Sequence, residues 1–116
     1  MNEEKRKHFR TDSLNLLNYI YFDKGEDEAT QGMGRTLNVS ESGILLETHS
    51  PMEEKNIVSL TIGLREKMVD IKGRVIYSKK NAAGMYESGI EFFDVDSASQ
   101  KVIREYTAAF NTSTNE

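Results

Sequence analysis

The chain has 116 residues, of which 37% are hydrophobic and 29% charged, and this size and composition indicate one small globular domain. It has no cysteine, which excludes disulfides, iron–sulfur clusters, thiolate zinc sites and cysteine nucleophiles. No apolar run approaches the ~20 residues that a membrane span needs, and none follows the basic N-terminal residues, so we expect neither a membrane span nor a secretory signal.

The net charge of −4 is unevenly distributed along the chain. Of the 15 basic and 19 acidic residues, four basic and two acidic ones lie in the first ten positions, which leaves 11 basic and 17 acidic residues over 11–116. An acidic body argues against a binder of nucleic-acid polymers, because many phosphates require many Lys and Arg side chains. We expect residues 1–11 to form a flexible basic N-terminal arm, because its charged residues have no apolar anchor other than Phe9.

The first half of the remaining chain has strand-forming patterns. A β-branched and aromatic run predicts a strand over 16–22, and the acidic, glycine-punctuated stretch 24–34 predicts a solvated loop. We expect a second strand over about 34–39 and a third over 43–48. Pro51 cannot donate a ladder hydrogen bond, so it indicates a turn after the third strand.

The second half continues with alternating strands. Over 57–63, aliphatic side chains alternate with Ser and Thr, which predicts a strand with one buried face. The segment 68–78 has the clearest two-residue period, and this period places Tyr77 on the inner face, in the core. A loop over 79–84 and a sixth strand over 85–93 follow.

The pattern changes to a helical period near the C-terminus. Ser97 and Gln100 have the spacing of a capping box, which predicts Ser97 as the helix N-cap. We expect the helix to end near Phe110 and residues 111–116 to form a frayed polar tail. Apolar residues recur every three or four positions and predict the buried helix face: Val102, Ile103, Tyr106 and Phe110.

Six short strands followed by one amphipathic helix predict an all-β barrel with a helix. The expected architecture is a six-stranded antiparallel barrel with a C-terminal α-helix packed on it, over residues 12–110. Closing the sheet into a barrel protects its edges. No internal repeat or interdomain linker interrupts this pattern, so we expect a single folded unit.

Two short segments are candidates for a binding site. The first is an R-x-x-x-R arrangement, Arg6 to Arg10, and the second is an N-x-S-x-x-G turn between the second and third strands, Asn38 to Gly43. Each alone is common, because basic segments and polar turns are frequent. Together, in this order and on this strand pattern, they resemble the PilZ domain. The segments Gly73–Tyr77 and Ser88–Phe92 also resemble strands of that family.

The resemblance implies a fold, a ligand and a set of contacts. PilZ domains are bacterial receptors for cyclic di-GMP, and their fold is a six-stranded antiparallel barrel with a C-terminal helix. By resemblance, the protein is a cytoplasmic receptor that binds cyclic di-GMP, needs no cofactor and signals to a downstream protein partner. The implied ligand contacts are Arg6, Arg10, Asn38, Ser40 and Gly43. Additional candidates are Lys5, Arg35 and Arg74.

The residue types suit this ligand, which has two phosphodiesters and two guanines. An arginine fork matches a phosphate in two-point hydrogen bonding, and its flat face stacks on a base. Asn38 offers an amide, Ser40 offers a hydroxyl, and Gly43 permits a positive φ or close approach of a ligand. The arm thereby supplies a local positive field on an otherwise acidic protein.

Other classes of function have less support in the sequence. No carboxylate pair, metal cluster or nucleophile–base set occurs at a recognisable spacing, so we expect no catalytic residue and no enzyme activity. His8 and His49 lie 41 positions apart, which disfavours a metal site. The main alternative is a PilZ-like protein-interaction module that acts without a nucleotide. Whether one or two cyclic di-GMP molecules bind stays open.

Overall fold

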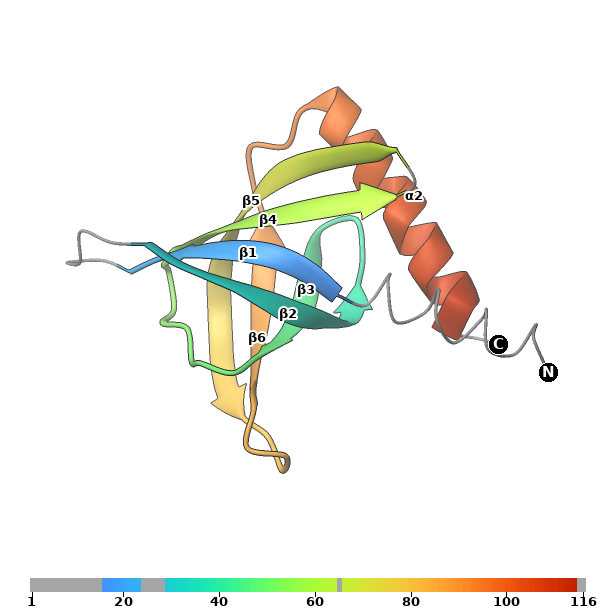
Figure 1. The fold of residues 1–116 in the computed structure, drawn as a ribbon. Coiled ribbons are helices and arrows are strands. Elements are labelled where there is room, and N and C mark those ends of the chain that lie inside the picture. The colour runs from blue at the N-terminus through green and yellow to red at the C-terminus, as the bar shows by residue number, and fades with distance from the viewer. Residues whose placement is uncertain (1–15, 24–28, 65, 115–116) are drawn as a thin grey trace.

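The computed structural model describes residues 16–23, 29–64 and 66–114. In this part of the chain, antiparallel strands form a closed barrel in the order β1-β2-β3-β6-β5-β4, and pairing of β1 with β4 closes it (Figure 1). The expected barrel with a C-terminal helix is therefore confirmed. The elements are β1 (Leu16–Phe22), β2 (Ala29–Val39), β3 (Gly43–Thr48), β4 (Ile57–Leu64), β5 (Lys67–Lys80), β6 (Tyr86–Phe92) and α2 (Ser97–Thr114).

The interior of the barrel follows the alternation predicted for the strands. In β4, Val58, Leu60 and Ile62 point inward and are fully buried. Burial of each such aliphatic side chain contributes roughly 1.5–3 kcal/mol. Alternate residues of β1 also belong to this core, including Tyr19 and Tyr21. The side chains on the outer faces of the strands remain partly or fully exposed.

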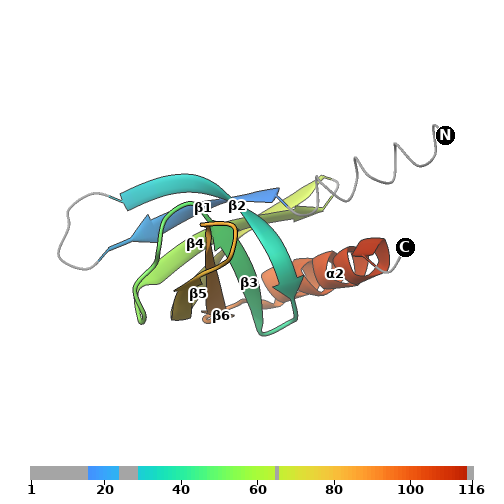
Figure 2. The ribbon, with the colours of Figure 1, turned by 90° about the horizontal axis from the view of Figure 1, so that it is seen from below.

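Helix α2 packs along the barrel against β4 and β5 (Figures 1 and 2). Its predicted apolar face is buried, and Ile103 is completely so. The hydroxyl of Tyr106 lies 3.0 Å from the hydroxyl of Thr36 on β2, and burial raises the pKa of Tyr106. This buried pair joins the helix to the strand that leads into the polar turn. No helix in the described part of the chain is long and apolar enough to cross a membrane.

Both ends of α2 differ from the prediction. Asp96, rather than Ser97, is the N-cap, because its Oδ1 accepts a hydrogen bond from the N–H of Ser99 at 2.7 Å. This hydrogen bond lowers the pKa of Asp96. The helix continues through Thr114, beyond the end expected near Phe110, since no Gly or Pro follows to stop it.

Strand β2 begins at Ala29, so the predicted loop is wrong for residues 29–34. The remainder of that loop, 24–28, lies outside the described residues. Glycine in this stretch makes room for a neighbour instead of forming a turn: a Cβ at Gly34 would lie 2.8 Å from Cγ of Leu46. Composition alone does not distinguish these two uses of glycine.

Strand β5 is longer than expected and contains a β-bulge. It continues to Lys80, so Lys79 and Lys80 are strand residues and the predicted loop began two residues too early. Its register against β6 shifts between Val75 and Tyr77. The extra residue moves Tyr77 to the outer face, where 41% of it is exposed. The prediction that Tyr77 lies in the core is therefore wrong.

Candidate functional site

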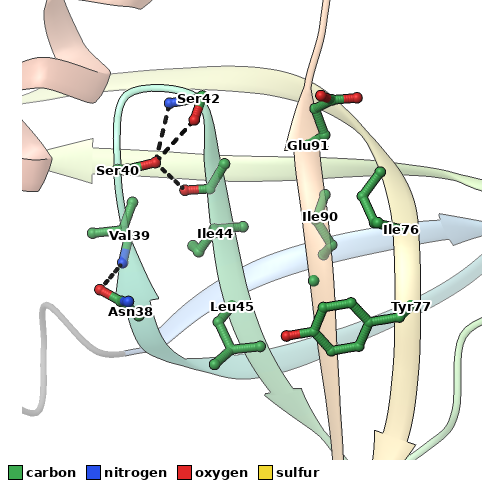
Figure 3. Close-up of a pocket in the computed structure, with 12 residues that line it drawn as sticks. Asn38, Val39, Ser40, Ser42, Ile44, Leu45, Ile76, Tyr77, Ile90 and Glu91 are labelled. Atoms are coloured by element: carbon green, nitrogen blue, oxygen red, sulfur yellow. Dashed lines mark hydrogen bonds between the residues drawn. The ribbon is translucent and has the colours of Figure 1, made fainter.

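The turn between β2 and β3 contains the second motif, and its own side chains fix its shape. The N–H of Ser40 donates to the carbonyl of Gly43 at 2.9 Å. The N–H of Ser42 donates to Oγ of Ser40 at 3.2 Å, as Figure 3 shows. Oδ1 of Asn38 accepts from the N–H of Val39 at 2.9 Å. The exposed Asn38 side chain therefore keeps its Nδ2 group as a donor toward solvent or a ligand.

Glycine is needed at position 43 because strand β6 passes close to its backbone. Among the described glycines, only Gly84 has a positive φ, so the turn does not use Gly43 for a left-handed conformation. A Cβ at Gly43 would lie 2.5 Å from the carbonyl oxygen of Ile90 on β6. The absence of a side chain at this position thus lets β3 and β6 pair closely where the turn meets the sheet.

A pocket of about 330 Å³ lies beside this turn on the outer face of the barrel. Strands β2, β3, β6 and β5 are adjacent here, and their register places Asn38, Leu45, Gly89 and Tyr77 in one row. We refer to this pocket as the serine-turn pocket (Figure 3). Its lining residues are Asn38, Val39, Ser40, Ser42, Gly43, Ile44, Leu45, Ile76, Tyr77, Gly89, Ile90 and Glu91.

The phenol ring of Tyr77 forms a flat wall of the pocket. The ring lies against Gly89, because a Cβ there would be only 2.5 Å from ring atom Cε2. An exposed aromatic face beside aliphatic side chains is suited to stacking a planar base. This wall is not apparent from the sequence, because the two-residue period of the strand places Tyr77 in the core. The run Val75-Ile76-Tyr77, which interrupts the alternation of the strand, is the signal that could have indicated a bulge.

Glu91 supplies the one charged side chain among the lining residues. Its cross-strand neighbours are Gly43 on β3 and Arg74 on β5. The guanidinium of Arg74 instead lies 4.7 Å from the centre of the Phe93 ring, and within the described residues no ion pair joins it to Glu91. Arg74 therefore flanks the pocket without lining it.

Arg35 is also outside the pocket and has a partner of its own. Its Nε donates to Oε1 of Glu47 at 3.2 Å. Asn81 donates to the other oxygen of Glu47 at 2.9 Å and to Glu87 at 3.1 Å. These contacts form a polar row across β2, β3 and β6 that borders the pocket on one side.

The turn is connected to helix α2 as well as to the sheet. Oε1 of Glu41 lies 3.4 Å from Nε of Arg104 and 3.5 Å from Nε2 of Gln100. The carbonyl of Ser42 accepts from the N–H of Phe92 at 2.9 Å. Exposed ion pairs contribute only about 0–1 kcal/mol. These contacts therefore orient the turn more than they stabilise the fold.

The structure thus brings together the three predicted residues of the second motif. Arg35 and Arg74 flank the resulting pocket. The basic candidates Lys5, Arg6 and Arg10 lie outside the described residues. The described part of the chain holds no group of three or more His, Asp or Glu side chains that could bind a metal ion.

A closed antiparallel barrel with a polar turn and an aromatic wall on its outer face defines a small β-barrel binding domain. The family model of the PilZ domain matches residues 4–109, and the chain belongs to the PilZ domain family. PilZ domains are typically non-catalytic binding domains, and the family suggests a cyclic di-GMP receptor or adaptor. No curated protein gives a significant match to the chain.

Proposed function

We propose that this protein is a cyclic di-GMP receptor that acts as an adaptor in the bacterial cytoplasm, without catalytic activity or a cofactor. The observation that carries the proposal is the position of Asn38, Ser40 and Gly43 in one pocket whose wall is the exposed ring of Tyr77. Membership of the PilZ family supports the same ligand. Cyclic di-GMP presents the planar bases and phosphate oxygens that such a pocket would bind.

The chemistry of the serine-turn pocket suits part of this ligand. A base stacked on Tyr77 would gain roughly 1–3 kcal/mol. The hydroxyls of Ser40 and Ser42 and the amide of Asn38 are donors for phosphate oxygens or base acceptors. At about 330 Å³, the pocket is near the lower end of the roughly 300–1,000 Å³ typical of ligand sites. A second element must therefore cover the rest of a cyclic dinucleotide.

In this proposal the N-terminal arm is the second element. Leu16, the first residue of β1, pairs with Arg35, and Arg35 precedes Asn38 by three positions on β2. Arg10 precedes Leu16 by six positions, and an extended chain of that length spans roughly 20 Å, which is enough to reach the pocket. Arg6 and Arg10 would then supply the positive charge that two phosphates require and that the pocket lining lacks.

The adaptor role follows from ordering of this arm. Ligand binding would fix the arm against the barrel, and the ordered arm would create or cover a surface for a downstream protein partner. The contacts of Glu41 with Arg104 and Gln100 extend the effect to α2, because they join the ligand-binding turn to the helix.

Calorimetric titration with cyclic di-GMP tests the proposal. A hydrogen bond to a charged group contributes roughly 1.5–3 kcal/mol, so Arg6→Ala and Arg10→Ala should each weaken binding roughly tenfold or more. Lys101→Ala is the matched control, because it removes one positive charge from the exposed side of α2. Higher salt should also weaken binding by the wild type. Equal affinity in all four proteins would contradict the role of the arm, and no binding by the wild type would contradict the ligand.

A second candidate function is a protein-interaction module that works without a nucleotide. The observation that favours it is a set of exposed apolar side chains on the outer faces of β1, β2 and β5, none of which lines the serine-turn pocket. Leu16, Met33 and Met68 are 48%, 55% and 66% exposed there. A thermal-shift experiment with cyclic di-GMP, GMP and GTP separates the two functions. A shift with cyclic di-GMP alone supports the receptor, and no shift with any nucleotide supports the interaction module.

A further inference from the structure

We infer that Glu91 selects guanine, by accepting hydrogen bonds from the N1–H and N2–H groups of a base bound in the serine-turn pocket. This inference rests on the proposed function, because it concerns the ligand of the same pocket. It assigns a specificity role to a strand residue that lies in neither of the two motifs.

The position of Glu91 suits contact with the edge of a base. Glu91 lies on the outer face of β6, two residues beyond Gly89 and therefore about 6.8 Å farther along the strand. Because the ring of Tyr77 lies against Gly89, a base stacked on this ring would direct one edge along β6 toward Glu91. Figure 3 shows Tyr77 beside Leu45 and Glu91 near the turn, so the two residues lie at opposite ends of the pocket.

The charge of Glu91 argues for a donor in the ligand. An ionised carboxylate only accepts hydrogen bonds, and the phosphates of a cyclic dinucleotide offer only acceptors. A carboxylate beside them would oppose binding unless it met N–H or O–H groups. In the described structure Glu91 has no ion pair that neutralises it, since Arg74 packs on Phe93.

Guanine provides the donors that a carboxylate needs. Its N1–H and N2–H groups lie side by side and match the two oxygens of a carboxylate in a two-point contact. Adenine has an acceptor at N1, and the lone pair of this nitrogen would repel the carboxylate of Glu91. Hypoxanthine keeps N1–H and lacks the N2 amino group, so cyclic di-IMP removes one of the two hydrogen bonds and leaves the sugars and phosphates unchanged.

The experiment compares binding of cyclic di-GMP and cyclic di-IMP to wild type and Glu91→Gln by calorimetry. The wild type should prefer cyclic di-GMP roughly tenfold or more, which corresponds to one hydrogen bond to a charged group. Glu91→Gln should lose most of this preference, because the Gln amide places an N–H group against a base donor. Cyclic di-AMP should bind the wild type more weakly than either ligand.

The matched control is Glu87→Gln, which removes the same charge from the outer face of the same strand. Glu87 does not line the pocket and accepts a hydrogen bond from Asn81 at 3.1 Å. The control should keep the full preference for cyclic di-GMP. An unchanged preference in Glu91→Gln, including an equal change of affinity for both ligands, would overturn the inference while the receptor function stood. Failure of the wild type to bind cyclic di-GMP would overturn both.

Discussion

Replacement of Gly89 by Ala tests whether the ring of Tyr77 forms the ligand-binding wall. The new Cβ would lie 2.5 Å from ring atom Cε2 and 3.0 Å from Cδ2 and Cζ. Tyr77 is 41% exposed and its ring lies at the end of a flexible side chain, so the ring should move away from β6 without forcing the strands apart. We expect the free energy of unfolding to change by less than about 1 kcal/mol.

The effect on binding should be much larger than the effect on stability. Loss of stacking removes roughly 1–3 kcal/mol, which weakens the affinity for cyclic di-GMP roughly five- to 150-fold. Tyr77→Ala should lose about as much, and Tyr77→Phe should bind nearly as the wild type does. Calorimetric titration of the three variants and the wild type measures these differences, with urea denaturation as the check on stability.

The double variant separates displacement of the ring from a direct clash between the new Cβ and the ligand. If Gly89→Ala acts through the ring, it should have no further effect in the Tyr77→Ala background. Undiminished affinity in Tyr77→Ala would show that the ring does not contact the ligand. The same loss from Gly89→Ala in both backgrounds would show that this substitution does not act through the ring.

Three further predictions concern the fold that supports the site. Gly43→Ala places a Cβ 2.5 Å from the backbone oxygen of Ile90, so it should lose roughly 1–3 kcal/mol and lower the urea midpoint, and wild-type stability would contradict the close approach. Tyr106→Phe removes the hydroxyl 3.0 Å from that of buried Thr36 and should cost about 1–2 kcal/mol at neutral pH. Because burial raises the pKa of Tyr106, the stabilisation by this residue is complete below the pKa of about 10 in the unfolded chain and is lost as the pH rises through the folded pKa. In alkaline urea titrations, Tyr106→Phe should therefore lose stability less steeply than the wild type. An equally steep decline would count against this role. Asp96→Ala should lower the melting temperature at neutral pH, whereas Asp96→Asn keeps a capping oxygen. Because a hydrogen bond lowers the pKa of Asp96, the difference in melting temperature between wild type and Asp96→Ala should shrink as the pH falls below about 4. A difference that grows in acid would contradict the capping role.

Local sequence patterns predict most of the fold because alternation and helical period follow directly from burial. The strict alternation in β4 and the spacing of Ile103 and Tyr106 in α2 identified their buried faces correctly. The predictions are wrong where the position of a residue depends on a neighbour that is distant in the sequence. Gly34 is a strand residue that accommodates Leu46, and Tyr77 turns outward because of a bulge against β6. Neither relation is visible within a short window of sequence.

The candidate site was predictable only in part, for the same reason. Asn38, Ser40 and Gly43 lie within six consecutive residues, so their motif could be identified directly. The opposite wall comes from β6 and β5. Strand β6 pairs with β3, although β4 and β5 lie between them in the sequence. Tyr77 and Glu91 therefore reach the pocket through topology and register, which single-sequence patterns do not specify.

Binding of cyclic di-GMP in the serine-turn pocket predicts chemical-shift changes at defined positions. Amide NMR spectroscopy of isotope-labelled protein during a titration with cyclic di-GMP tests binding and location together. We predict saturable shifts for the amides of Ser40, Tyr77 and Gly89, with the amide of Asn18, on the opposite outer face, unchanged. No shift at saturating ligand, or shifts confined to the face around Asn18, would contradict binding of cyclic di-GMP in this pocket.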